Sequence, residues 1–283
     1  MKKKMLALSV LGAGAAIGAA IAPSSQKHPL EPVFRDRCFA HRGLYDNSQI
    51  AENSLEAFSM AAEGGYGIEL DVQLSADNQV VVFHDDCLLR MCGIDAPVNS
   101  RTYQQLSQLP LGDTAQSIPL FQDVLKLIDG SVPLIVELKS TTQIGTLCLL
   151  TYDLLRNYKG PFCIESFNPL IVDWFRKNAP QIMRGQLAMK SKKSGGLEVV
   201  HSMLLSNLMY NFLSRPHFIA YDCRDNNCKH VLFLCRAMGA FLVGWTVHEE
   251  DYERCCQQFD SIIFEGFYPP RMIERSPEDG FEE

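Results

Sequence analysis

The sequence predicts one α/β domain folded as a closed (β/α)₈ TIM barrel. A chain of 283 residues is long enough for one such barrel, which takes about 200 to 250 residues, together with a short appendage. Hydrophobic residues make up 47% of the chain and charged residues 21%, which is typical of a soluble globular core. From Arg37 onward, short apolar runs alternate with segments of helical periodicity. This alternation is typical of parallel strands that are joined by helices.

Eight apolar runs predict the barrel strands. In chain order they are Arg37–Ala40, Gly67–Val72, Pro133–Leu138, Phe162–Phe167, Met183–Ala188, Phe218–Tyr221, Ala240–Trp245 and Ser261–Phe264. The segments between them predict helices over Ser54–Glu63, Phe121–Asp129, Thr142–Tyr158, Pro169–Lys177, Leu197–Leu213, Asn226–Met238 and Glu249–Gln257. Asn53 is expected to cap the first of these helices.

Two segments interrupt the alternation. Val80–Phe83 reads as an extra strand that follows the second barrel strand after a short turn at residues 76–78, so these two strands are expected to form a hairpin. The segment Cys87–Ile118 has weak periodicity and several turn residues, and we expect an insertion over the barrel mouth at about residues 87–118. The sequence shows no internal repeat, and residues 27–283 are interpreted as one barrel domain.

The first 26 residues differ from the rest of the chain. Lys2–Lys4 precede an uncharged run, Met5–Ala22, which as an α-helix would be about 27 Å long, close to the bilayer core of about 30 Å. A secretory signal peptide is the alternative, because small residues near Ala20–Ala22 fit a cleavage site, but Pro23 directly after them argues against cleavage. We therefore expect residues 1–26 to be an uncleaved membrane anchor, with the lysines inside and the barrel extracytoplasmic.

Two further features bear on this localisation. If Pro23–Asp36 were extended at about 3.3 Å per residue, it would form a tether of about 45 Å between membrane and barrel. The ten cysteines show no zinc-ligand spacing and are interpreted as mostly free thiols, which favours a reducing compartment and weighs against an extracytoplasmic barrel. Secretion after cleavage, or a barrel that faces the cytoplasm, are the alternatives.

The net charge argues against nucleic acid as a partner. The formal charge of the chain is −7, and Met1–Gln26 holds three lysines and no acid, so the globular part is near −10. A surface of this charge repels phosphate backbones. The expected partners are a small-molecule substrate and, through the N-terminal segment, a membrane.

Charged residues in the first half of the chain lie where a barrel places an active site, at the carboxyl ends of the predicted strands. They are His41 and Arg42 after the first strand, Glu69 and Asp71 in the second, His84 after the hairpin strand, and Glu137 and Lys139 after the third. Residues i and i+2 of a strand point to the same face, so Glu69 shares a side with Asp71. The same spacing holds for Glu137 and Lys139.

These residue types indicate a chemistry. Three converging carboxylates would repel one another unless a cation lay among them, and oxygen ligands select a hard divalent ion, Ca²⁺ or Mg²⁺, over zinc. The two histidines offer an acid and a base. Arg42 and Lys139 offer positively charged donors for an anionic substrate.

Six strings of the sequence resemble motifs of the glycerophosphodiester phosphodiesterase family, in its bacterial form with an N-terminal hydrophobic segment. They are HRG (His41–Gly43), ENS (Glu52–Ser54), IELDVQLSADNQVVVFHDD (Ile68–Asp86), VELK (Val136–Lys139), ESFNP (Glu165–Pro169) and GWTV (Gly244–Val247). The resemblance runs from about Cys38 to Ile263, essentially the whole globular part. The family fold is a (β/α)₈ barrel, in agreement with the strand pattern.

The resemblance implies roles for individual residues. It implies a metal site at Glu69, Asp71 and Glu137, acid–base histidines at His41 and His84, and phosphate contacts from Arg42 and Lys139. Trp245 is a candidate for the substrate cleft, with core packing as the alternative. Glu52 is expected to bind the metal or to orient Arg42 or His41, and a simple interaction with the helix N-terminus is the alternative. Glu165 and Phe167 have no assigned role.

Two positions near the C-terminus depart from the family pattern. Phe264-Glu265-Gly266 stands where relatives usually carry a threonine and an aspartate, and His248 stands where an asparagine is common. Because both lie at the late strands, we expect them to alter substrate contacts rather than the metal site or the histidines.

The predicted function is metal-dependent hydrolysis of glycerophosphodiesters to an alcohol and sn-glycerol 3-phosphate, with His/His acid–base catalysis. The nucleophile is either water or the neighbouring glycerol hydroxyl, which would form a cyclic phosphate first. One alternative is a lysophospholipase D that acts on membrane lysolipids. A remote alternative is a non-catalytic, membrane-tethered binding protein, which the presence of every expected carboxylate and histidine disfavours.

Overall fold

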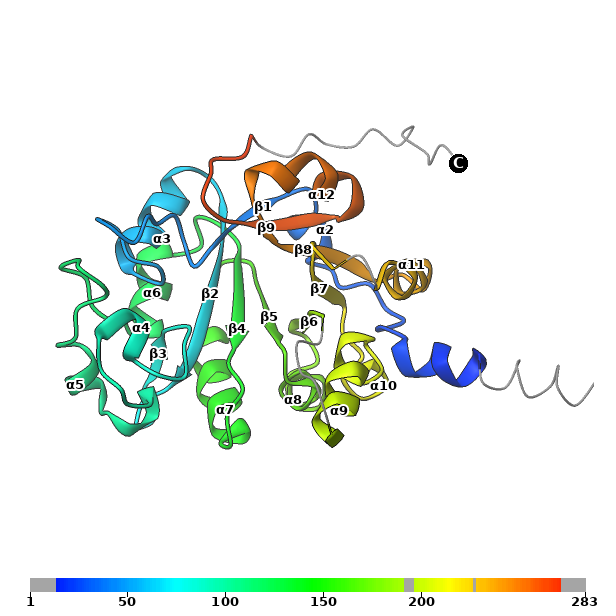
Figure 1. The fold of residues 1–283 in the computed structure, drawn as a ribbon, viewed down its shortest axis with the longest axis horizontal. Coiled ribbons are helices and arrows are strands. Elements are labelled where there is room, and N and C mark those ends of the chain that lie inside the picture. Colours follow the sequence, from blue (N-terminus) through cyan, green and yellow to red (C-terminus); the bar gives the residue numbers. More distant parts are fainter. Residues whose placement is uncertain (1–13, 191–195, 226–227, 271–283) are drawn as a thin grey trace, which may run out of the picture.

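The computed structural model describes residues 14–190, 196–225 and 228–270. Eight parallel strands close into a barrel, as the sequence predicts (Figure 1). They are β1 (Cys38–His41), β2 (Gly67–Leu74), β4 (Leu134–Leu138), β5 (Phe162–Ser166), β6 (Met183–Ala188), β7 (Phe218–Asp222), β8 (Phe241–Val247) and β9 (Ser261–Phe264). Strand β1 pairs with both β2 and β9, and these pairings close the barrel. The predicted hairpin is also present, because β3 (Val80–Val82) pairs antiparallel with the end of β2.

The register between neighbouring strands brings acidic residues side by side. His41 of β1 lies beside Glu69 of β2, and Asp71 of β2 lies beside Glu137 of β4. Glu137 in turn lies beside Glu165 of β5. Because the barrel strands are parallel, these residues gather at one end of the barrel, the mouth formed by the carboxyl ends of the strands.

Helices surround the barrel. They are α3 (Leu55–Glu63), α6 (Phe121–Ile128), α7 (Ile144–Leu155), α8 (Pro169–Asn178), α9 (Gly196–Ser206), α10 (Asn211–Ser214), α11 (Lys229–Ala237) and α12 (Tyr252–Gln258). A large apolar cluster lies between these helices and the outer face of the strands. This two-layer packing holds the strand ends, and therefore the mouth, in place.

Three details of the predicted helices are wrong. The side chain of Ser54, not that of Asn53, caps α3. The segment predicted as one helix, Leu197–Leu213, contains α9 and α10, because Leu208 between them has a left-handed backbone (φ 58°) that a continuous helix excludes. The segment Glu249–Gln257 begins as a 3₁₀ turn, η3 (Glu249–Asp251), before α12.

Apolar side chains fill the barrel interior, and a short helix covers its amino end. The helix α2 (Glu31–Phe34) places Phe34, which is 1% exposed, against Phe39 of β1, with ring centroids 5.6 Å apart. The expectation of an extended tether over Pro23–Asp36 is therefore wrong, because burying Phe34 is more favourable than leaving it in water. The ten cysteines are free thiols, as predicted, and seven of them are buried.

The insertion has a small apolar core of its own. It contains α4 (Leu89–Cys92), the 3₁₀ turn η1 (Val98–Ser100) and α5 (Tyr103–Leu106). Buried side chains such as Leu88 and Val98 pack with Val81 of β3 and with the adjoining Phe83. Because β3 pairs with the end of β2, the insertion lies at the rim of the mouth, beside the hairpin (Figure 1).

The end of the apolar N-terminal run is fixed to the barrel. Residues 14–21 form a helix that lies between α10 and α11 (Figure 1). Ile21 is 1% exposed, and its carbonyl accepts a hydrogen bond from Asn211 Nδ2 at 2.9 Å. The first part of the predicted anchor, residues 5–13, lies outside the described residues. Among the residues that the structure describes, no helix has the length and apolar character needed to cross a bilayer.

Candidate active site

A buried group of three carboxylates lies at the centre of the mouth. Glu69 is 3%, Asp71 1% and Glu137 7% exposed. Each offers one oxygen, and these oxygens lie within 4.8 Å of one another. Lys139 Nζ lies 3.2 Å from Asp71 Oδ1 and 2.9 Å from Glu137 Oε1. Closely spaced carboxylate oxygens fit a hard divalent cation, which binds oxygen ligands at about 2.0 to 2.6 Å.

The electrostatics of this group favour an added positive charge. Burial, together with the charges of Asp71 and Glu137, holds the pKa of Glu69 well above its ordinary value. Burial also raises the pKa of Glu137 to about 7, although Lys139 opposes the shift. For Asp71, burial is outweighed by Lys139 and its other cationic neighbours, and the pKa lies below its ordinary range. A cation among the three oxygens would therefore relieve repulsion that Lys139 only partly offsets.

Arg42 is held in place by carboxylates on two sides. Its backbone is left-handed (φ 57°), and its amide donates to Glu69 Oε2 at 3.1 Å. Its Nη1 donates to Glu52 Oε1 at 2.8 Å, and Glu52 is held from the other side by Arg90 of the insertion. Of the roles predicted for Glu52, this geometry agrees with the one in which Glu52 orients Arg42. Asn53, predicted to be a helix cap, instead donates its side-chain amide to Asp71 at 2.8 Å.

His41 is paired with Glu265, a residue that was expected to alter substrate contacts. Its Nδ1 lies 2.5 Å from Glu265 Oε2, and its Nε2 lies 4.0 Å from Glu69 Oε2. Although burial opposes ionisation, the hydrogen bond with His41 lowers the pKa of Glu265 to about 2. The difference from the family pattern at Glu265 therefore changes the surroundings of His41, contrary to the expectation that it alters substrate contacts rather than the histidines. Burial holds the pKa of His41 below its ordinary value, although Glu265 opposes the shift.

His84 has a partner of the same kind. Its Nδ1 lies 2.5 Å from Asp85 Oδ1, and Arg90 Nε in turn donates to Asp85 Oδ2 at 2.6 Å. Burial lowers the pKa of His84, while the charge of Asp71 opposes the shift. A carboxylate at Nδ1 fixes the ring and places the proton there, so Nε2 is the nitrogen that remains for proton transfer. Arg90 was not among the predicted site residues, and only its position on the insertion brings it to the mouth.

One cavity of about 230 Å³ joins these groups. Its lining comprises His41, Arg42, Glu69, His84, Glu137, Glu165, Phe167, Leu187, Met189, Trp245, Thr246 and Ile263. The rings of Trp245 and Phe167 meet edge to face, with centroids 5.5 Å apart. The cavity thus has a charged side with the histidines and carboxylates and an apolar, aromatic side. The structure places the predicted cleft residue Trp245 on the latter.

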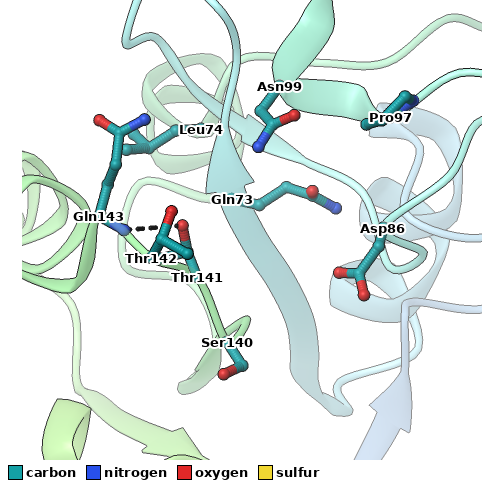
Figure 2. A pocket seen from close by; sticks show the side chains of 9 residues that line it. All are labelled: Gln73, Leu74, Asp86, Pro97, Asn99, Ser140, Thr141, Thr142 and Gln143. Atoms are coloured by element: carbon teal, nitrogen blue, oxygen red, sulfur yellow. Dashed lines mark hydrogen bonds between the residues drawn. The ribbon is translucent and has the colours of Figure 1, made fainter.

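A second, larger cleft adjoins the mouth. It has a volume of about 420 Å³ and is lined by Gln73, Leu74, Asp86, Pro97, Asn99, Ser140, Thr141, Thr142 and Gln143 (Figure 2). Ser140 follows Lys139 directly, and its hydroxyl accepts from the side chain of Asn168, which follows the cavity residue Phe167. The lining holds amides and hydroxyls, one carboxylate and no aromatic ring.

The comparisons with known proteins agree with this fold and site. Residues 41–263 match the model of the glycerophosphoryl diester phosphodiesterase family. A glycerophosphodiester phosphodiesterase of Caldanaerobacter subterraneus is 29% identical over 238 residues, which cover 79% of this chain and 91% of that protein. The Bacillus subtilis protein YhdW is 35% identical over 257 residues, which cover 83% of this chain and 96% of that protein.

Solved structures show the same architecture. A phosphodiesterase from Oleispira antarctica, in complex with the product sn-glycerol-3-phosphate, superposes with a TM-score of 0.66 at 22% identity, over 82% of this chain and 93% of that one. A glycerophosphodiester phosphodiesterase from Thermotoga maritima has a TM-score of 0.62 at 25% identity, over 80% and 93% of the two chains. Fold, matched residues and relatives lead to one conclusion: the chain belongs to the glycerophosphoryl diester phosphodiesterase family and is a phosphoric diester hydrolase.

Proposed function

We propose that this enzyme hydrolyses glycerophosphodiesters to an alcohol and sn-glycerol 3-phosphate, with His41 and His84 as the proton-transfer groups. The observation that carries the proposal is that two histidines, each paired through Nδ1 with a carboxylate, line the same cavity as Glu69 and Glu137 of the buried acidic triad. One histidine accepts the proton of the nucleophile, and the other protonates the leaving alcohol. Arg42 and Lys139 provide positive charge for the phosphate group.

Glu69, Asp71 and Glu137 fit a divalent cation, Ca²⁺ or Mg²⁺, because they offer three oxygens within 4.8 Å of one another. When bound, such an ion supplies positive charge that stabilises the developing charge on the phosphate oxygens. The chain's own residues then bind the phosphodiester, orient it and move the protons. Glu52 contributes by holding Arg42 at a fixed position.

We place the leaving alcohol in the polar cleft of Figure 2, whose lining includes Ser140, the residue that directly follows Lys139. Its amides and hydroxyls match a head group rich in hydroxyls, such as glycerol or inositol. A quaternary ammonium group is recognised mainly by aromatic rings, and the lining of this cleft contains none. The proposal therefore favours neutral polyol head groups over choline.

The N-terminal segment, Met5–Ala22, is proposed to attach the enzyme to a membrane, with the barrel extracytoplasmic. Its uncharged run and the preceding lysines support this proposal. Exposed apolar side chains gather on neighbouring helices: Phe212 is 53%, Phe233 68% and Leu234 47% exposed, on α10 and α11. These helices flank residues 14–21 (Figure 1), and Asn211 of α10 and Cys235 of α11 both contact the carbonyl of Ile21.

A lysophospholipase D activity is the second candidate. A stretch of 80 residues is 41% identical to the human lysophospholipase D GDPD3, which corresponds to 28% of this chain and 24% of that protein. The attachment geometry disfavours this candidate. Ser24 donates its amide to the carbonyl of Pro216, just before β7, so the segment meets the barrel at the end opposite the mouth. The anchor thus does not bring the mouth to the bilayer surface.

The two activities are separated by assaying glycerophosphocholine and lysophosphatidylcholine side by side with the full-length enzyme, in the presence of Ca²⁺ or Mg²⁺. The proposal expects release of glycerol 3-phosphate from the first substrate at a clearly higher kcat/KM than release of lysophosphatidic acid from the second. A preference for the lipid would replace the proposed function by the second candidate. If neither these two substrates nor other glycerophosphodiesters are hydrolysed, the proposed activity is wrong.

A further inference from the structure

Arg90 of α4, in the insertion, holds two carboxylates at once. Its Nη2 donates to Glu52 Oε1 at 2.6 Å, and its Nη1 donates to Glu52 Oε2 at 2.9 Å. Its Nε donates to Asp85 Oδ2 at 2.6 Å, and its Nη2 also donates to Asp85 Oδ1 at 3.1 Å. Every nitrogen of the guanidinium is therefore bonded to a carboxylate oxygen, and each carboxylate receives two bonds. A planar guanidinium has donors for this arrangement, whereas the ammonium group of a lysine does not.

Each of these carboxylates contacts a different residue of the proposed mechanism. Glu52 Oε1 also accepts from Arg42 Nη1 at 2.8 Å, and Asp85 Oδ1 lies 2.5 Å from His84 Nδ1. Arg42 and His84 line the catalytic cavity, and Arg90 is not among the described residues that line it. Arg90 therefore acts on the phosphate-binding arginine and on the proton-transfer histidine through their carboxylate partners.

The charge of Arg90 also affects how much positive charge Arg42 can offer to a phosphate group. Glu52 is 3% exposed, and although burial opposes its ionisation, Arg90 and Arg42 hold its pKa below the ordinary value. Two guanidinium groups share the negative charge of this one carboxylate. Without Arg90, the charge of Glu52 would be offset by Arg42 alone, and Arg42 would attract a phosphate less strongly.

The apolar core of the insertion determines where Arg90 lies. Leu88 and Met91, on either side of Arg90 in the chain, are buried in this core together with Val81 of β3. The side chain of Arg90 is 45% exposed, whereas that of Glu52 is 4% exposed. Without Arg90, Glu52 would still be paired with Arg42, and an exposed ion pair contributes little to stability. Substitution of Arg90 should therefore leave the protein folded.

We propose that Arg90 is a positioning residue that couples His84 to Arg42, and that the insertion contributes to the reaction through it. This inference rests on the proposed function, because it takes the roles of His84 and Arg42 from there. A change at Arg90 should affect phosphate binding and proton transfer together. A change at Glu52 should affect mainly the first, and a change at Asp85 mainly the second.

The first test separates KM from kcat with the full-length enzyme on glycerophosphoglycerol, in the presence of Ca²⁺ or Mg²⁺. Arg90→Met should lower kcat and raise KM by about 10-fold each, the effect of losing a partner that orients a functional group. Arg90→Lys keeps the charge but cannot hold both carboxylates in this way, so it should recover at most one of the two parameters. Full recovery of both would overturn the proposal. Arg101→Met, at an arginine of the same insertion that forms no ion pair with a described residue, is the matched control.

Two double variants distinguish this coupling from a general disturbance of the structure. In a Glu52→Gln background the contact with Arg42 is already weakened, so Arg90→Met should lower kcat again but change KM by less than about twofold. In an Asp85→Asn background Arg90→Met should raise KM again but change kcat by less than about twofold. If Arg90→Met changes both parameters in both backgrounds as much as in wild type, Arg90 acts through neither carboxylate and the proposal is wrong.

Two measurements do not depend on turnover. Calorimetry gives the affinity for glycerol 3-phosphate, which Arg90→Met should weaken by about 5- to 10-fold through Arg42. The proton on His84 Nδ1, assigned with His84→Ala, should give an NMR signal in wild type that is lost by exchange with water in Arg90→Met. Unchanged affinity and an unchanged signal would contradict the inference. If both effects are found but wild type hydrolyses no glycerophosphodiester, the proposed function fails while the positioning by Arg90 stands.

Discussion

Glu265 and His41 join the last strand of the barrel to the first through a hydrogen bond of 2.5 Å between Oε2 and Nδ1. The two residues are 224 positions apart in the chain, and barrel closure alone makes them neighbours. A carboxylate at Nδ1 orients the imidazole and stabilises its protonated form. The pair therefore links the architecture of the barrel to its proton-transfer chemistry.

Replacing Glu265 by glutamine should lower kcat by about 10- to 100-fold, as other losses of groups that orient a histidine do. Because Glu265 raises the pKa of His41, its loss lowers that pKa further. The limb of the pH–rate profile that reports His41 should therefore move to lower pH. A shift of the acid limb would assign His41 as the base, and a shift of the alkaline limb would assign it as the acid. Glu250→Gln, at an exposed position, should change neither parameter.

Removing either histidine should abolish proton transfer without unfolding the protein. His41→Ala and His84→Ala should each lower turnover by about 10²- to 10⁴-fold, with an unchanged circular dichroism spectrum. The wild-type profile should be bell-shaped. Since burial lowers the pKa of both histidines, the midpoint of the acid limb should lie below the ordinary histidine value of about 6.5. An active double variant would remove both residues from the mechanism.

Chelation should remove activity if the acidic triad holds a divalent ion. EDTA is expected to abolish hydrolysis, and Ca²⁺ or Mg²⁺ to restore it. Glu69→Ala and Asp71→Ala should lose activity and the rise in unfolding temperature that the ion causes in wild type. Comparing the two ions at equal concentration identifies the one that is used. Full activity in a chelated sample would contradict the metal assignment.

Deleting residues 1–13 should release the protein from the membrane fraction without destabilising it. This truncation retains Ile21, which is buried against the barrel. By contrast, Ile21→Ala in the full chain should lower the free energy of unfolding by about 2 to 5 kcal/mol, since it leaves a cavity. Fractionation and denaturant unfolding measure the two effects separately. Protease treatment of intact cells tests the orientation: a membrane-bound barrel that resists cleavage would show that it does not face outward.

Head-group preference tests the role of the polar cleft. Glycerophosphoinositol and glycerophosphoglycerol should be hydrolysed with a higher kcat/KM than glycerophosphocholine. Asn99→Ala should reduce the value for the polyol substrates by about fivefold, the effect of one neutral hydrogen bond, and leave the choline substrate unchanged. Asn157→Ala, at an exposed position at the end of α7, is the control. A higher value for the choline substrate would place the leaving group outside this cleft.

Local sequence patterns determined the barrel. Each strand is a short apolar run whose side chains are buried, so all eight were predictable within two residues at either end. The spacing of Glu69 and Asp71 on one strand likewise placed them on one face, because side chains alternate along a strand. The helix ends were less predictable. Leu208 has a left-handed backbone conformation, and no local sequence pattern predicted the break between α9 and α10.

Only the tertiary structure decided which distant residues complete the site. Glu265 reaches His41 because β9 pairs with β1, and Arg90 reaches Glu52 because the insertion packs on β3. Phe34 packs against the barrel interior because burying its side chain is favourable. The segment predicted to be an extended tether therefore covers the amino end of the barrel. Secondary structure depends on interactions between residues that are close in the chain, and the hydrophobic periodicity of the sequence therefore predicts it. The contacts of Glu265 with His41 and of Arg90 with Glu52 depend instead on barrel closure and packing. These bring together residues that are far apart in the sequence, and their spacing does not predict the contact.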